Sequence, residues 1–161
     1  MWFNDVWSLT VSGIQEVAKY AARIGVGLCI ETHIGYLTMS ARYCIKLIDD
    51  VNMNNVGMLF EYAWVELAGA ETGAEAVRKA ARYISHIHIK DWKLETRMPL
   101  VKKSCLMGEG TVDWDAVLPA IREIGYTGYI SDEYEKFWYP EDLPDAEIGM
   151  KHNLDYCRSH L

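Results

Sequence analysis

The feature that most constrains the fold of this chain is one pattern that occurs four times in succession. An amphipathic segment with helical spacing is followed by a short apolar run that ends in polar residues. The pattern predicts helices over residues 13–24, 40–50, 74–83, 114–124 and 146–160, and strands over 26–33, 56–62, 84–90 and 128–135. Strands that alternate with helices in this way form a parallel sheet with crossover helices. The sequence therefore predicts an α/β fold.

Local signals mark where these segments begin and end. Gly25 follows the first helix at a position that favours a left-handed residue, and Asp113 precedes the fourth helix as its N-cap. Residues 92–112 are expected to form a long loop, and the pattern leaves the structure of residues 1–12 undetermined. No linker separates the units, so residues 1–161 are expected to form a single domain.

The composition excludes several classes of function. The net charge is −7 and the basic residues are scattered, which argues against nucleic acid and anionic membranes as partners. No apolar run approaches the ~18 residues that a membrane span needs. The four cysteines form no Cys-x-x-Cys motif and are expected to be reduced thiols, which indicates a cytoplasmic protein without a signal peptide.

Acidic and imidazole side chains stand near the carboxyl end of every predicted strand. In chain order they are Glu31 and His33, Glu61, His86 and His88, and Glu133 and Glu135. Sites in parallel α/β folds form where the carboxyl ends of the strands meet, so these groups are expected to converge. Several carboxylates at one point repel one another unless they bind a cation. Three carboxylates with one imidazole suit Mn²⁺, Mg²⁺, Co²⁺ or Zn²⁺.

Five segments in a fixed order connect this pattern to a known family. They read Cys-Ile-Glu-Thr-His from residue 29, Gly-Met-Leu-Phe-Glu from 57, His-Ile-His-Ile-Lys-Asp from 86, Gly-Glu-Gly-Thr-Val-Asp-Trp from 108 and Gly-Tyr-Thr-Gly-Tyr-Ile-Ser-Asp-Glu-Tyr-Glu from 125. From residue 13 onward the chain resembles the xylose-isomerase-like superfamily of sugar phosphate isomerases and epimerases. The resemblance implies one half of a (β/α)8 TIM-type barrel, in which the four strands correspond to strands five to eight.

The resemblance also implies a site and a chemistry. In the family each of these four strands gives one ligand to a divalent metal ion, with Mn²⁺ the preferred choice here. By position the metal ligands are Glu31, Glu61, His88 and Glu133. Such enzymes move a proton beside a carbonyl of a sugar or sugar phosphate, and Glu31 and Glu133 are the expected catalytic pair. The expected substrate-binding residues are His33, Lys90, Arg97 and Trp138.

Several neighbouring residues have structural interpretations. Lys90 either reaches over its strand end to a substrate oxygen or forms a salt bridge with Asp91. His86 is expected to be a hydrogen-bonded residue inside the barrel, and Glu135 to form a salt bridge with one of two basic residues, Lys136 or Arg122. The Gly108-Glu109-Gly110 segment lacks the Lys-Ser or Lys-Thr that completes a P-loop, so it is interpreted as a structural turn.

The sequence departs from the family at three points. Glu61 stands where the family has Asp, and its side chain is longer by one methylene. Trp64 and Leu94 stand where ketose 3-epimerases have a substrate-binding histidine and arginine. The first four strands are missing, so the sheet is expected to have two open edges. The chain then closes by self-association, pairs with a complementary half-barrel chain, or is a fragment of a longer barrel.

Other functions stay open at this point. The chain is alternatively a non-catalytic or truncated half-barrel subunit that needs a partner, or a family member with lyase or carbon-glycoside-cleaving activity. A sugar-binding module would keep the aromatic residues and bind no metal. The metal content of the purified chain separates these classes.

Overall fold

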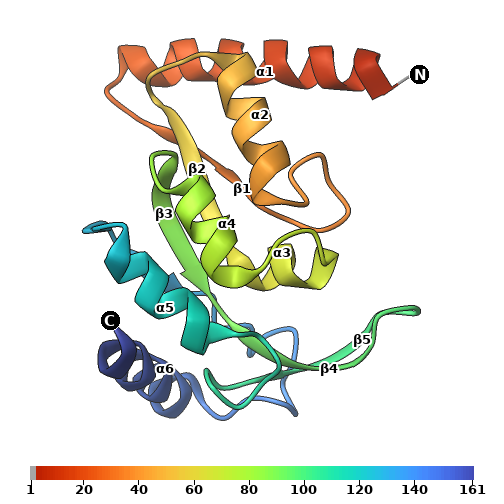
Figure 1. Ribbon diagram of the computed structural model, residues 1–161, viewed down its shortest axis with the longest axis vertical. Coiled ribbons are helices and arrows are strands. Elements are labelled where there is room, and N and C mark those ends of the chain that lie inside the picture. Colours follow the sequence, from red (N-terminus) through yellow and green to blue (C-terminus); the bar gives the residue numbers. More distant parts are fainter. Residues whose placement is uncertain (1–2) are drawn as a thin grey trace.

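The computed structural model describes residues 3–161, and its centre is a sheet of four parallel strands (Figure 1). The strands lie in the order β1 (Leu28–Glu31), β2 (Val56–Glu61), β3 (Ile84–Ile89) and β6 (Ile130–Asp132). All three strand pairs are parallel, which confirms the predicted α/β fold. Each strand is shorter than its predicted range, by between one and five residues.

Helices connect the strands and cover one face of the sheet. They are α1 (Phe3–Arg23), α2 (Ala41–Val51), α3 (Tyr62–Ala68), α4 (Gly73–Ala80), α5 (Trp114–Glu123) and α6 (Ala146–His160). Figure 1 shows α2, α4, α5 and α6 following one another along this face, with α1 crossing the β1 end of the molecule. The predicted cap is confirmed, because the Asp113 carboxylate accepts a hydrogen bond from the Ala116 N–H at 3.2 Å.

Three segments differ from the sequence-based expectation. Residues 3–12, left undetermined above, are part of α1, while residues 1–2 lie outside the described part of the chain. The short helix α3 begins directly after β2 and was not predicted. The predicted loop over residues 92–112 is wrong for much of its length, because β4 (Asp91–Thr96) and β5 (Val101–Cys105) form an antiparallel hairpin. The buried residues of this hairpin lie together at its base (Asp91, Trp92, Ser104 and Cys105), and its many charged residues leave no strand period in the sequence.

The hydrophobic core lies between the sheet and the helices. Along β2 the side chains of Val56, Met58 and Phe60 point to the helices and are at most 8% exposed. Trp92 and Trp114, each at most 2% exposed, close this core at the carboxyl ends of the strands. The alternate residues of the strands point to the opposite face, which is where Glu61 and the other polar residues of the strand ends lie.

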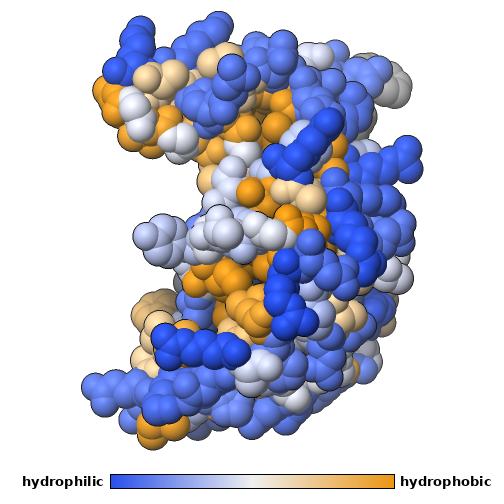
Figure 2. Space-filling model, turned by 60° about the vertical axis from the view of Figure 1, so that its left-hand side comes forward, coloured by the Kyte–Doolittle hydropathy of each residue, from blue (hydrophilic) through white to orange (hydrophobic). Residues whose placement is uncertain are grey.

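The opposite face and the two edges of the sheet carry exposed apolar groups. Within residues 3–161 neither β1 nor β6 pairs with a second neighbour. Figure 2 shows a hollow in the molecule in which hydrophobic residues gather. Large exposed hydrophobic side chains lie on the two edge helices: Leu9, Val17 and Tyr20 on α1, and Ile148, Met150 and Leu154 on α6. Exposed apolar surface of this kind indicates surfaces that contact another part of a protein.

No helix of residues 3–161 is both long enough and apolar enough to cross a membrane. All four cysteines, which lie in this part of the chain, are free thiols.

Candidate metal centre

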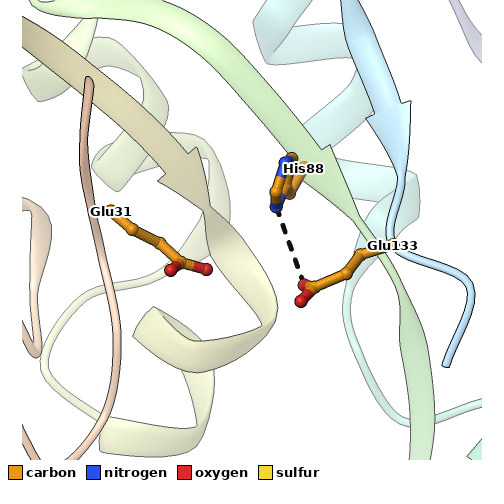
Figure 3. Close-up of side chains that lie close together, drawn as sticks. All are labelled: Glu31, His88 and Glu133. Carbon is orange, nitrogen blue, oxygen red and sulfur yellow. Dashed lines mark ion pairs between the residues drawn. The ribbon is translucent and has the colours of Figure 1, made fainter. Parts of the chain in front are cut away.

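Three side chains from separate strands meet at the carboxyl edge of the sheet. Glu31 is the last residue of β1, His88 lies in β3, and Glu133 follows β6 directly. One ligand atom of each lies within 4.8 Å of the others, and the side chains point toward a common centre (Figure 3). Parallel pairing produces this convergence, because it brings the carboxyl ends of all four strands to one edge. The Glu133 N–H donates to the Ile89 carbonyl at 3.0 Å, which holds Glu133 beside β3.

The ring of His88 gives the clearest indication that this site binds an additional group. Its Nδ1 is buried and has no hydrogen-bond partner among residues 3–161, and it lies 3.7 Å from Glu133 Oε2. Buried polar atoms are nearly always satisfied, so this nitrogen indicates a site for an additional group. Two carboxylates and one imidazole are ligands that Mn²⁺, Co²⁺ and Zn²⁺ accept. These residues therefore fit a divalent metal ion.

The neighbouring imidazole has a structural role. His86 Nε2 lies 2.8 Å from Ser131 Oγ, and its ring is perpendicular to the His88 ring at a centroid distance of 5.5 Å. This is the hydrogen-bonded interior position that the sequence predicted for His86. Burial, followed by the nearby His88, lowers the pKa of His86, so His86 stays neutral near pH 7.

Glu61 is fully buried and lies outside this cluster of three ligand atoms. Its Oε1 accepts a hydrogen bond from the Ala63 N–H at 3.1 Å, so Glu61 is the N-cap of α3. Its Oε2 has no hydrogen-bond partner among the described residues. Burial raises the pKa of Glu61 well above its ordinary value, although the nearby Lys90 opposes this shift.

Lys90 brings a buried ammonium group to the edge of the site. The side chain is 4% exposed, and its Nζ lies 2.5 Å from Glu133 Oε2 and 3.8 Å from Glu61 Oε2. Burial alone would lower the pKa of Lys90, but the surrounding carboxylates raise it. Burial likewise opposes ionisation of Glu133, but the nearby His88 and the Lys90 ammonium group outweigh it and lower the pKa of Glu133 to about 2. Glu133 is therefore an anion at neutral pH, as a metal ligand must be.

Comparison with known proteins agrees with this geometry. The family model described as "Xylose isomerase-like TIM barrel" matches residues 4–160. The chain belongs to this family. Among its curated relatives, a D-psicose 3-epimerase of Ruminiclostridium cellulolyticum is 27% identical over 127 residues, covering 77% of this chain and 40% of the relative. An inosose dehydratase of Yersinia enterocolitica is 27% identical over 150 residues, covering 84% of this chain and 50% of the relative.

Solved structures of the xylose isomerase-like family have the same fold. A xylose isomerase domain protein from Planctomyces limnophilus is 29% identical, with a TM-score of 0.71 over 92% of this chain and 50% of that one. The IolI protein, solved with a bound zinc atom, is 22% identical, with a TM-score of 0.82 over 100% of this chain and 59% of that one. The chain thus spans about half the length of the relatives that it matches.

The substrate-binding residues expected from the xylose isomerase-like family lie in different surroundings. The His33 ring packs on Trp64 at 4.4 Å, and its Nδ1 lies 2.7 Å from the Ile34 carbonyl oxygen. The Arg97 guanidinium donates to the Leu67 carbonyl at 2.6 Å, so it lies on the last turn of α3. Trp138 is 73% exposed and contacts its neighbour Phe137. Among residues 3–161, Lys90 is the one of these four residues that forms an ion pair with a member of the Glu31–His88–Glu133 cluster.

Lys102 is a residue of this site that the sequence did not reveal. It lies on β5, its side chain is 8% exposed, and its Nζ is 2.9 Å from the Tyr139 hydroxyl and 3.9 Å from Glu135 Oε2. The ammonium also lies over the Trp92 ring at 4.5 Å. The sequence of β5, Val-Lys-Lys-Ser-Cys, has no alternation of apolar and polar residues, so it gave no signal for a strand or for a buried lysine. Glu135 pairs with Lys90 and Lys102, and not with the basic neighbours considered above.

The glycine-rich turn of this family member holds a carboxylate of the chain itself. The Asp91 side chain accepts hydrogen bonds from the N–H groups of Trp92, Gly108, Gly110 and Val112, at 2.8 to 3.3 Å. Asp91 is 1% exposed, so these amides replace its water shell. The contacts support the structural interpretation of the turn, and they leave Asp91 without the salt bridge to Lys90 considered above.

Proposed function

We propose that this chain carries the metal-binding half of a divalent-metal-dependent enzyme of the isomerase or epimerase type, acting on a small sugar or a related polyol. The observation that carries the proposal is the cluster of Glu31, His88 and Glu133, with one ligand atom of each within 4.8 Å of the others. The family relationship adds support, because the relatives include a 3-epimerase and inosose dehydratases.

The proposed reaction is proton transfer at a carbon beside a carbonyl. A divalent ion held by the three ligands supplies a Lewis acid for the negative charge that develops on the substrate oxygens. Glu31 and Glu133 belong to β1 and the end of β6, so they approach the centre from opposite sides. One glutamate removes the proton and the other returns it, which inverts the carbon. Return to the neighbouring carbon gives isomerisation instead.

We propose Mn²⁺ as the ion, because two carboxylates with one imidazole combine hard oxygen ligands with a nitrogen ligand. The proposed ligands are Glu31, His88 and Glu133. Glu61, which the family pattern assigns as the fourth ligand, lies outside their cluster. His33 and Trp138 are proposed to contact substrate when the rest of the pocket is present. The free thiols are consistent with a cytoplasmic location.

We also propose that the four parallel strands are strands five to eight of a (β/α)8 barrel. The open edges at β1 and β6 and the apolar hollow of Figure 2 support this proposal. The other half of the barrel comes from a second copy of the chain, from a complementary half-barrel chain, or from another part of a longer protein to which these residues belong. Because this half supplies the facing wall of the pocket, catalysis requires the closed assembly.

The first test measures metal binding to the purified chain. Isothermal titration with Mn²⁺ is expected to give one site per chain, and Glu133→Gln should weaken binding by about 100-fold or more, since it removes a charged ligand. Glu147→Gln, an exposed substitution on α6, is the matched control and should bind as the wild type does. A wild-type chain that binds no divalent ion would refute the proposal.

The second test examines the reaction with the closed assembly. A panel of ketoses and inososes is incubated in D₂O with Mn²⁺, and the products are analysed by mass spectrometry. Epimerisation places one deuterium on the inverted carbon, while a dehydratase releases water. The dehydratase outcome is the second candidate, favoured by the inosose dehydratases among the relatives. Full turnover in the presence of EDTA would reject both mechanisms.

A further inference from the structure

Glu61 has a position that conflicts with binding a metal ion together with Glu31, His88 and Glu133. Strand β2 passes into helix α3 at this residue without a connecting loop. The Glu61 carboxylate therefore turns to the N-terminus of α3, where Oε1 accepts the Ala63 N–H at 3.1 Å. With one oxygen held by the helix, the carboxylate stays outside the 4.8 Å cluster that the other three residues form.

The second Glu61 oxygen accepts no hydrogen bond among the described residues, but it forms a long ion pair with Lys90. Both side chains are buried, with 0% and 4% exposure, and Lys90 Nζ lies 3.8 Å from Glu61 Oε2. A buried charge that lacks a partner is strongly destabilising, so a charged Glu61 requires this ammonium group beside it. The ring of Trp64 covers the ammonium at 4.5 Å, and this contact adds a cation–π interaction on a side shielded from water.

The same ammonium group also contacts the candidate metal centre. Lys90 Nζ donates to Glu133 Oε2 at 2.5 Å, so it contacts a proposed ligand while it compensates Glu61. A positive charge thus stands beside the cluster, in contact with one of its three carboxylate and imidazole groups. Hydrogen bonds of this kind orient a ligating carboxylate.

We propose that Glu61 is not a metal ligand but the positioning residue of Lys90, so that a buried Glu61–Lys90 pair replaces the fourth ligand. The inference rests on the proposed metal-dependent function and makes it more specific. Three protein ligands leave more coordination positions for substrate oxygens and water than four do. The ammonium group meanwhile keeps Glu133 in its ligand orientation.

The first experiment separates a ligand from a positioning residue by spectroscopy. The wild type, Glu61→Gln and Glu133→Gln are titrated with Mn²⁺ by calorimetry and with Co²⁺, whose visible absorption reports the number and type of its ligands. Glu61→Gln keeps the shape of the side chain and an oxygen that can cap α3. It is expected to keep the Co²⁺ spectrum and to change the Mn²⁺ dissociation constant by less than about threefold, against about 100-fold for Glu133→Gln. A changed spectrum with a large loss of affinity in Glu61→Gln would overturn the inference.

The second experiment tests the pair without any metal. In urea denaturation with EDTA present, Lys90→Met is expected to lower the midpoint, because it leaves the buried Glu61 carboxyl group without the ammonium group beside it. Adding Glu61→Gln to Lys90→Met should restore most of the loss, whereas adding Glu75→Gln, an exposed control on α4, should not. Absence of this rescue would disprove the pairing. If the wild type binds no metal, the proposed function fails, and the rescue still decides whether Glu61 and Lys90 are partners.

Discussion

At the scale of single residues, Asp91 shows that a charged side chain can be buried when backbone amides surround it. Four N–H groups converge on its carboxylate, and three of them come from the turn at residues 108–112. Such close approach of the backbone leaves no space for a side chain at Gly110. An added Cβ there would lie 1.9 Å from Asp91 Oδ1 and 2.5 Å from the Trp92 carbonyl oxygen. Position 110 therefore requires a residue without a side chain.

This contact predicts opposite effects for two glycine substitutions. Gly110→Ala should destabilise the protein by about 3 kcal/mol, because the turn must move away from Asp91. Gly13→Ala is the matched control, since Gly13 lies in the exposed face of α1 with no atom within 4 Å of its added Cβ. It should stabilise the protein by about 0.5–1 kcal/mol. Urea denaturation measures both, and equal effects of the two substitutions would contradict the assigned role of Gly110.

Asp132 predicts how stability depends on pH. Burial raises its pKa from 3.8 to about 6, although the Asn153 side chain opposes the shift through a hydrogen bond. Between pH 4 and pH 6 the folded protein holds a proton that the unfolded chain releases, so this contribution to stability is present below pH 4 and is lost as pH rises through 6. Burial of Glu66, whose pKa is raised to about 7, acts in the same direction.

Asp132→Asn should remove part of this dependence. Relative to the wild type, the variant should be more stable at pH 7 than at pH 4.5, by about 1–2 kcal/mol when the partial exposure of Asp132 is taken into account. Denaturation at the two pH values measures this difference. Glu109→Gln, an exposed substitution in the turn at residues 108–110, serves as the control. If the control changed in stability between the two pH values as much as Asp132→Asn does, burial of Asp132 would not be the cause.

At the scale of elements, the β4–β5 hairpin extends the site beyond the sheet. Its inner side places Lys102 over Trp92 and beside Tyr139, next to the carboxylates at the strand ends. Its tip is attached to α3, since the Arg97 guanidinium donates to the carbonyl groups of Glu66 and Leu67. A cation at the carboxyl end of a helix also interacts favourably with the helix dipole. The hydrogen bonds of Arg97 therefore hold the tip of the hairpin against α3.

The hairpin contact predicts that Arg97 acts on stability and not on metal binding. Arg97→Ala should lower the free energy of unfolding by about 1 kcal/mol, through the loss of exposed hydrogen bonds. The Mn²⁺ affinity should be the same as in the wild type. Lys103→Ala, which removes an exposed ion pair with Glu95 on the same hairpin, should have a smaller effect on stability. Loss of metal affinity in Arg97→Ala would show that the hairpin shapes the centre directly.

At the scale of the whole molecule, the exposed edges dominate the properties of the isolated chain. An apolar groove of about 410 Å³ lies between β6 and α6, with Ile89, Ile130 and Leu154 in its lining. The other edge presents the apolar face of α1, with Val17 and Tyr20 more than half exposed. A hydrophobic groove at one edge and a hydrophobic helix face at the other suit head-to-tail contact between parallel half-barrels.

These edges predict association in solution. Sedimentation equilibrium should give a mass above the 18.4 kDa of one chain, and Leu154→Glu should return the mass to that of the monomer by placing a charge in the groove. Glu147→Gln on the same helix should associate as the wild type does. A wild-type chain that stays monomeric with a cooperative melt would favour a complementary chain, or no partner at all, over self-association.

The sequence by itself determined the parallel α/β architecture and the convergence of Glu31, His88 and Glu133. Both follow from local periodicity, since apolar runs form the strands and parallel pairing brings their polar ends to one edge. Only the tertiary structure decided the surroundings of Glu61 and Lys90. These depend on a strand that enters a helix without a loop and on a lysine buried among several carboxylates. Contacts between segments far apart in the chain have no local period, so the sequence pattern cannot express them.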